Sequence, residues 1–141
     1  MKRILILEDN LEVLLVLIKQ IKRIEKVSSE EIAVSVVSEG EKADFFKKDL
    51  EEDRFDVVLL DRYSRDQENF HQAVLNVINP KKAIAISSMP SANQIALEKG
   101  IEKGVEKDYA NLELFGEKVK KAIEEILNLN QKNERERHKK E

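Results

Sequence analysis

Short apolar runs alternate with longer amphipathic stretches along most of this 141-residue chain. The runs are short and rich in aliphatic and β-branched residues, as expected for strands. They are nearly continuous instead of alternating with polar residues, which is typical of a parallel sheet covered on both faces. The predicted strands are 4–7, 33–37, 57–60, 83–86 and, with a weaker pattern, 104–106.

Between these runs, apolar residues recur at the spacing of an α-helix. The predicted helices span about 11–27, 41–50, 67–78, 91–99 and 115–126. In the second of them, we expect Phe45 and Phe46 to face the core. The first helix has an apolar stripe of Leu11, Leu14, Leu15, Ile18 and Ile21. The last has one of Phe115, Val119, Ala122, Ile123 and Ile126.

Strand and helix therefore alternate five times, which predicts an α/β fold with a doubly wound, five-stranded parallel sheet. In such sheets, ligands bind at the carboxyl ends of the strands, at the point where the winding reverses. The length favours a single domain, which we assign to residues 1–128. We expect the polar tail, residues 129–141, to be frayed or disordered.

Candidate site residues directly follow the first, third, fourth and fifth predicted strands. Carboxylates about 5 Å apart repel one another by about 3 kcal/mol per pair at an effective dielectric near 20, so three of them need a counter-charge. One lysine does not neutralise three acids. Hard oxygen ligands without nitrogen or sulfur favour Mg²⁺. These residues are Glu8 and Asp9, Asp61, Ser87 and Ser88, and Lys107.

Some of these residues have a second interpretation when taken alone. Glu8 and Asp9 precede a predicted helix at once, where acids favour the helix dipole. Ser87 and Ser88 also fit a simple turn after a strand. His71 and His138 are expected to be a helix-surface residue and a tail residue, because neither has a metal-ligand companion at helical spacing.

The order of these residues resembles the receiver domain of two-component response regulators. The resemblance covers residues 2–127 and rests on four motifs, each at a predicted strand end: ILILEDN, FDVVLLD, AIAISS and GVEKDY. It implies a flavodoxin-like (βα)5 receiver fold and phosphoryl transfer from a sensor histidine kinase or a phosphotransfer protein to an aspartate.

By this resemblance, Asp61 is the phosphoacceptor and Lys107 pairs with a phosphoryl oxygen. Ser87 stands where the family has a hydroxyl residue that contacts the phosphoryl group. Mg²⁺ is then held by Asp9 and Asp61, by Glu8 through water and by the carbonyl of Tyr63. A carboxylate nucleophile, a divalent cation and an ammonium suit this chemistry, since positioning and electrostatics carry most of phosphoryl transfer.

Two of the departures from the family pattern lie next to or near Lys107. Asp108 stands where the family usually has a proline after the lysine, and Gly104 stands where an aromatic residue usually takes part in the switch. The resemblance therefore implies intact chemistry with altered signal output.

Composition narrows the class of protein further. Charged residues make up 38% and hydrophobic residues 41%, which indicates a globular chain and not a disordered one. The absence of cysteine excludes disulfides and zinc–sulfur sites. A net charge of −3 and the short apolar run 13–18 favour neither nucleic acid nor a membrane as partner. With no secretory cleavage pattern after the first residues, we expect a cytoplasmic protein.

The sequence thus predicts a single-domain response regulator, a phosphoprotein of signal transduction that acts in a two-component system or phosphorelay. It would catalyse its own phosphorylation and dephosphorylation without turning over an external substrate, and would signal by binding an unknown downstream protein. One alternative is a pseudo-receiver, a phosphorylation-independent interaction module. Another is a Mg²⁺-dependent phosphohydrolase, although that chemistry usually needs a second aspartate where Tyr63 stands.

Overall fold

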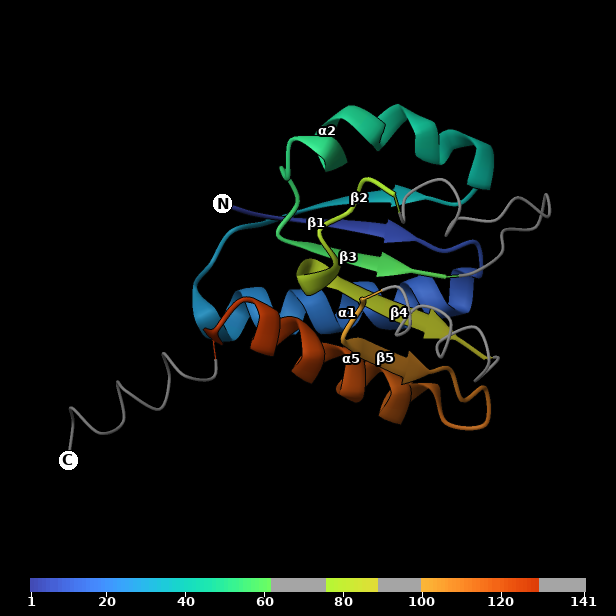
Figure 1. Ribbon diagram of the computed structural model, residues 1–141. Coiled ribbons are helices and arrows are strands. Elements are labelled where there is room, and N and C mark those ends of the chain that lie inside the picture. The colour runs from blue at the N-terminus through green and yellow to red at the C-terminus, as the bar shows by residue number, and fades with distance from the viewer. Residues whose placement is uncertain (62–75, 89–99, 130–141) are drawn as a thin grey trace.

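A parallel sheet of five strands forms the centre of the computed structural model, which describes residues 1–61, 76–88 and 100–129 (Figure 1). The strand order is β2-β1-β3-β4-β5. This arrangement confirms the predicted doubly wound α/β fold, because the winding reverses at β1, which lies between β2 and β3. The strands are β1 (Lys2–Leu7), β2 (Ile32–Val37), β3 (Val57–Leu60), β4 (Ala83–Ser87) and β5 (Lys103–Glu106).

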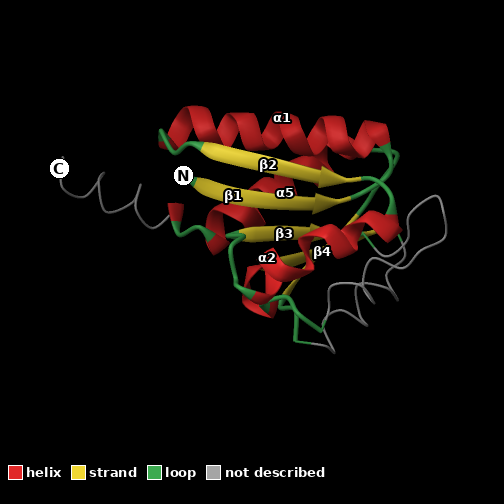
Figure 2. Cartoon of the chain, turned by 90° about the horizontal axis from the view of Figure 1, so that it is seen from above, coloured by secondary structure: helices red, strands yellow, loops and turns green. Residues whose placement is uncertain are grey.

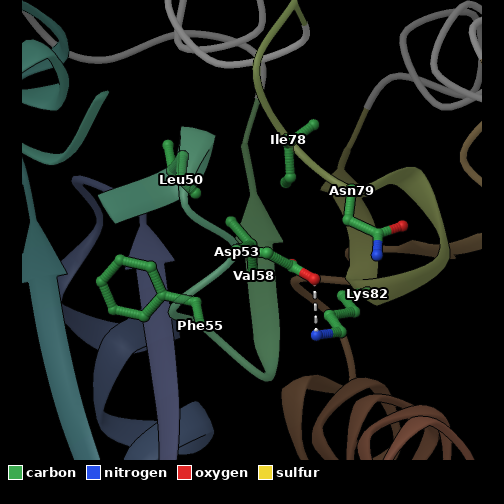
Figure 3. A pocket seen from close by; sticks show the side chains of 7 residues that line it. All are labelled: Leu50, Asp53, Phe55, Val58, Ile78, Asn79 and Lys82. Atoms are coloured by element: carbon green, nitrogen blue, oxygen red, sulfur yellow. Dashed lines mark hydrogen bonds and ion pairs between the residues drawn. The ribbon is translucent and has the colours of Figure 1, made fainter. Parts of the chain in front are cut away.

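Helices cover both faces of the sheet (Figure 2). One face carries α1 (Leu11–Ser28) and α5 (Leu112–Ile126), and the other carries the 3₁₀ helix η1 (Gly40–Phe46) and α2 (Lys47–Glu51). A short 3₁₀ turn, η2 (Pro80–Lys82), leads into β4. The helix predicted over 91–99 lies outside the described residues. Of the helix predicted over 67–78, the described part, residues 76–78, is a turn. No helix in the described ranges combines the length and apolarity needed to cross a membrane.

Two apolar clusters form the core, one on each side of the sheet. The first lies under α1 and α5 and includes Leu17, Phe115 and Val119. The stripe predicted on α5 is confirmed, since four of its five residues are buried and Ile126 is partly buried. Leu129, just beyond α5, is also buried in this cluster.

The apolar stripe predicted on α1 is wrong in its phase. Of its five residues only Leu14 and Ile21 are buried, whereas Leu11 and Leu15 are 69% and 71% exposed. Apolar residues occupy nearly the whole circumference of the first two turns, so the sequence pattern allows several orientations. The buried face is Val13, Leu14, Leu17, Gln20, Ile21 and Ile24. Contact with α5 fixes this phase: a methyl group on Gly116 would lie 2.5 Å from Val16 Cγ1.

The second predicted helix is also corrected. Residues 41–46 belong to η1, and only residues 47–50 belong to the α-helix α2. Phe46 packs against the second cluster and makes an edge-to-face contact with Phe55, with 5.8 Å between the ring centroids. Phe45, which was expected to face the core, is 75% exposed. Adjacent residues of a helix point about 100° apart, so both rings do not reach one core.

Asparagine caps start both long helices next to the strand ends. The Asn10 side chain accepts a hydrogen bond from Val13 N at 3.1 Å and so begins α1 directly after Asp9. The Asn111 side chain accepts one from Leu114 N at 3.1 Å and begins α5. The caps hold the β1–α1 and β5–α5 connections in place at one end of the sheet.

Candidate functional site

The candidate site lies at the carboxyl ends of β1, β3, β4 and β5. Its residues follow the strands so closely that the hydrogen-bond ladder still holds their backbones. Glu8 N donates to Val37 O at 3.1 Å, Asp61 N donates to Leu7 O at 2.9 Å, and Lys107 N donates to Ser87 O at 2.9 Å. The backbone therefore places three charged side chains at the same end of the sheet, where the strands terminate.

Lys107 links two of the acids in the site. Its Nζ donates to both carboxylate oxygens of Glu8, at 2.9 and 2.8 Å. The same nitrogen lies 3.2 Å from Asp61 Oδ1. Each of the three side chains is almost completely buried, with exposed fractions of 4% for Lys107, 0% for Glu8 and 11% for Asp61. A buried ammonium shared by two carboxylates is thus the centre of the site.

A third carboxylate completes the acidic group. One oxygen from each of Glu8, Asp9 and Asp61 lies within 4.8 Å of the others. Asp9 is less buried than its two companions. Ser87 ends β4 in a buried position next to β5. Among these residues, three carboxyl groups thus share one ammonium.

Burial and charge set the pKa values in the site. Burial, together with the neighbouring Asp61 carboxylate, raises the pKa of Glu8 to about 8 even though Lys107 opposes the shift. For Lys107, burial alone would lower the pKa, but Glu8 and Asp61 outweigh it and the pKa lies above its usual value of 10.5. The lysine therefore stays protonated at neutral pH, and the carboxyl group with the shifted pKa is that of Glu8.

This shift predicts that stability without divalent cations falls as pH rises from about 4.5 to about 8. In that range, folded Glu8 holds a proton that the unfolded chain has lost, so the folded state is favoured at the acidic end. Urea unfolding of wild type and Glu8→Gln at several pH values measures the effect, which should be on the order of a few kcal/mol across the range. The slope should be much smaller in Glu8→Gln, and exposed Glu102→Gln should keep it. Equal slopes in wild type and Glu8→Gln would contradict the assignment.

The donor set fits a hard divalent cation. All three acids offer oxygen, which suits Mg²⁺ or Mn²⁺. The pKa of Glu8 is raised by burial and by the Asp61 carboxylate in spite of Lys107, so the ammonium does not fully offset the charge around Glu8. A divalent cation would offset this charge further. Among the described residues, the structure thus supports a cation site made of Glu8, Asp9 and Asp61.

The site residues that were predicted from the sequence and that the structure describes come together. Glu8, Asp9, Asp61 and Lys107 share one cluster, and Ser87 ends the neighbouring strand. Tyr63 lies outside the described residues. The bidentate contact between Lys107 and Glu8 was not anticipated, because strand order, and not sequence spacing, decides which acid faces the lysine.

An aromatic residue to which the sequence assigned no role lies near the charges. Tyr109 is two residues after Lys107, in the loop between β5 and α5, and about half exposed. Burial raises the pKa of its phenol, and Glu8, Asp61 and Asp9 raise it further against the opposing effect of Lys107. Its position two residues after the lysine was the available signal.

Comparisons with known proteins find no match in sequence and a clear likeness in structure. By sequence, the chain matches no protein-family model, and curated proteins give no significant match. By structure, it is similar to the Mn²⁺-bound form of the response regulator Rcp1, with a TM-score of 0.64 and 18% identity over 88% of this chain and 92% of the other. It is also similar to the bacteriophytochrome response regulator AtBRR, with a TM-score of 0.59 and 21% identity over 89% and 92% of the two chains.

The chain therefore has the receiver fold of response regulators along almost its whole length. At these levels of identity, the likeness concerns the fold. The chemistry has to be argued from the site itself.

Proposed function

We propose that this protein is a single-domain response regulator that accepts a phosphoryl group on Asp61. The donor is a sensor histidine kinase or a phosphotransfer protein, and the reaction, in the cytoplasm, depends on Mg²⁺. The observation that carries the proposal is Lys107 Nζ between the buried carboxylates of Glu8 and Asp61, with Asp9 beside them. A structural ion pair needs one acid for one base, and this cluster has three acids.

In the proposed reaction, an Asp61 carboxylate oxygen attacks the phosphorus of a phosphohistidine. The new O–P bond forms as the N–P bond breaks, and the imidazole nitrogen keeps the electron pair of the broken bond. Lys107 is placed to pair with charge on the phosphoryl oxygens, since its Nζ already lies 3.2 Å from Asp61 Oδ1. Ser87, at the end of β4, would donate its hydroxyl to another phosphoryl oxygen.

Glu8, Asp9 and Asp61, with the carbonyl of Tyr63, are the residues that would hold Mg²⁺. When bound, Mg²⁺ offsets the negative charge that gathers on the phosphoryl oxygens. The pKa of Glu8 is raised by burial and by the neighbouring Asp61 carboxylate. A bound Mg²⁺ would offset that neighbouring charge and so would favour deprotonated Glu8. The chain's own residues otherwise position the acceptor and exclude water.

Phosphorylation would change the charge balance at Lys107. A phosphoryl group adds about 1.5 to 2 negative charges, so the ammonium would shift from Glu8 toward the modified Asp61. We propose that this change is passed to the surface and alters binding to a downstream protein.

The first test is phosphorylation by a small donor. The protein is incubated with acetyl phosphate or phosphoramidate, with Mg²⁺ or with a chelator, and the intact mass is measured. A gain of one phosphoryl group that requires Mg²⁺ supports the proposal. No gain at any donor concentration would contradict it, and continuous phosphate release without a phosphorylated protein would point to a hydrolase.

One observation favours the alternative of a pseudo-receiver. Gly104 is an exposed residue of β5, where the family usually has an aromatic residue of the switch, and Asp108 replaces the usual proline. In that case the Lys107 cluster would be structural, and the protein would bind its partner without phosphorylation. Unchanged partner affinity after phosphorylation would support this function.

A further inference from the structure

The two outer edges of the sheet have very different compositions. The four residues of β5 include Lys103, Gly104 and Glu106, and charge and glycine both discourage pairing with another strand. β2 has six residues, IAVSVV, without charge, glycine or proline. Such a strand at an edge is a template for pairing unless something protects it.

The backbone of β2 also points hydrogen-bonding groups outward. The carbonyls of Glu31 and Val37 accept from β1, so the odd-numbered residues face that strand. In a parallel ladder, the residues between them turn their N–H and C=O groups away. Ile32 confirms this direction, because its N–H donates to Glu25 Oε2 of α1 at 2.9 Å. Val34 and Val36 therefore present both of their backbone groups at the edge.

The side chains beside this edge are apolar. Val34 and Val36 are 37% and 42% exposed, on the same side of the sheet as Ile32, which packs against the α1 cluster. Leu11 and Ile18 continue the surface, since they precede Glu25 by fourteen and seven residues and so share its helix face. Figure 2 looks toward the β2 edge of the sheet, where β2 lies beside α1 and no described segment is drawn across it.

We propose that β2 pairs with β2 of a second copy of this chain. The two strands run antiparallel about a two-fold axis at Val34 and join two five-stranded sheets into one. The proposal does not depend on phosphoryl transfer.

The strand is self-complementary in this register. Val34 faces its own copy, and Ile32 faces Val36. Val34 can form a pair through both of its backbone groups, and Val36 N–H can donate to Ile32 O, whereas Ile32 N–H keeps its bond to Glu25 Oε2. On the α1 side the opposed side chains are β-branched and aliphatic, which is a favourable cross-strand combination. On the other side Ala33 faces Ser35, and both are small.

Charges select this register over its neighbours. With the axis at Val34, Glu30 faces Ser38 and Glu39 faces Ser29, one turn from Lys26 of α1. Moving the axis to Ser35 would place Glu31 opposite Glu39, and like charges directly opposite one another are destabilising. Moving it to Ala33 would place Glu30 opposite Val36 and shorten the apolar overlap.

This self-complementarity is the reason for choosing a second copy as the occupant. A strand from a different protein would need its own matching pattern, whereas β2 carries both halves of the match. Pairing of this kind is isologous, as in most closed dimers.

Sedimentation velocity over a range of concentrations tests the proposal. Wild type should form a concentration-dependent dimer, and Val34→Lys should weaken it by about tenfold or more, because two ammonium groups would meet on the axis. Val34→Pro should act similarly, because it removes only an outward-pointing N–H. Leu114→Lys, an equally exposed position on α5, is the matched control and should leave the dimer unchanged.

A charge-exchange experiment decides the register. Val34→Lys and Val34→Glu should each be monomeric, and an equimolar mixture should form a heterodimer, since residue 34 faces only itself in this arrangement. Circular dichroism checks that each variant is folded. A wild-type chain that stays monomeric up to about 0.5 mM, a regime of only millimolar affinity, would overturn the proposal. A dimer that ignores Val34→Lys, or a mixture without heterodimer, would also overturn it.

Discussion

Asp61→Asn is expected to abolish the gain of a phosphoryl group from acetyl phosphate or phosphoramidate. The amide nitrogen and oxygen keep the shape of the side chain but lack the anionic oxygen that attacks phosphorus. The change should not unfold the protein, because the Asp61 charge raises the pKa of Glu8 and its removal relieves a repulsion within the buried cluster. Intact-mass measurement after incubation with donor and Mg²⁺ gives the result.

Asp44→Asn is the matched control for this experiment. Asp44 is exposed in η1, and its replacement should leave phosphorylation unchanged. A phosphorylated Asp61→Asn protein would show that another residue is the acceptor. Urea unfolding of the same sample separates loss of chemistry from loss of the fold.

Lys107→Met is expected to destabilise the protein by about 3 kcal/mol at a pH above 8, since removing one partner of a buried ion pair leaves the other charge uncompensated. Two carboxylates would then share the buried space without an ammonium. At acidic pH the loss should be smaller, because Glu8 holds a proton below a pKa of about 8. Urea midpoints at about pH 6 and about pH 9 measure the difference.

Lys103→Met, four residues earlier on β5, provides the comparison. Lys103 also pairs with an acid, Glu125 at 2.6 Å, but both side chains are partly exposed. An exposed pair contributes at most about 1 kcal/mol, so this variant should be close to wild type. The double variant Lys107→Met with Glu8→Gln should recover much of the lost stability. Equal losses in the two lysine variants would mean that burial of the cluster has no energetic consequence.

The order of the strands brings the site residues together at the strand ends. Glu8 and Asp61 lie side by side because β1 and β3 are neighbours in register, with Leu7 opposite Leu60. The lysine reaches them from β5, ninety-nine residues from Glu8 along the chain. A parallel sheet with crossover helices brings such distant residues together at the carboxyl ends of its strands. This explains why a function can be proposed from residues that follow strands.

Much of the site was predictable because it depends on local pattern. A buried strand ends where its apolar run ends, and the next residues lie at the end of the sheet. The positions of Glu8, Asp61, Ser87 and Lys107 followed from that rule, and the doubly wound α/β fold followed from the alternation of strands and helices. The receiver fold was predicted from the resemblance of the motifs at the strand ends. Their contacts did not follow, because sequence spacing contains no information on which acid the lysine selects.

By itself, the sequence determined the five strands and the α/β class, the two-sided burial of β1, β3 and β4, and the polar residues that follow the strands. The tertiary structure alone decided the orientation of α1, the exposure of Phe45, the bidentate contact of Lys107 with Glu8 and the position of β2 at the outer edge of the sheet. The physical reason is the range of the interactions. Periodicity reports which residues share a face of one element, whereas strand order and helix contact, such as that of Val16 with Gly116, decide which face is covered.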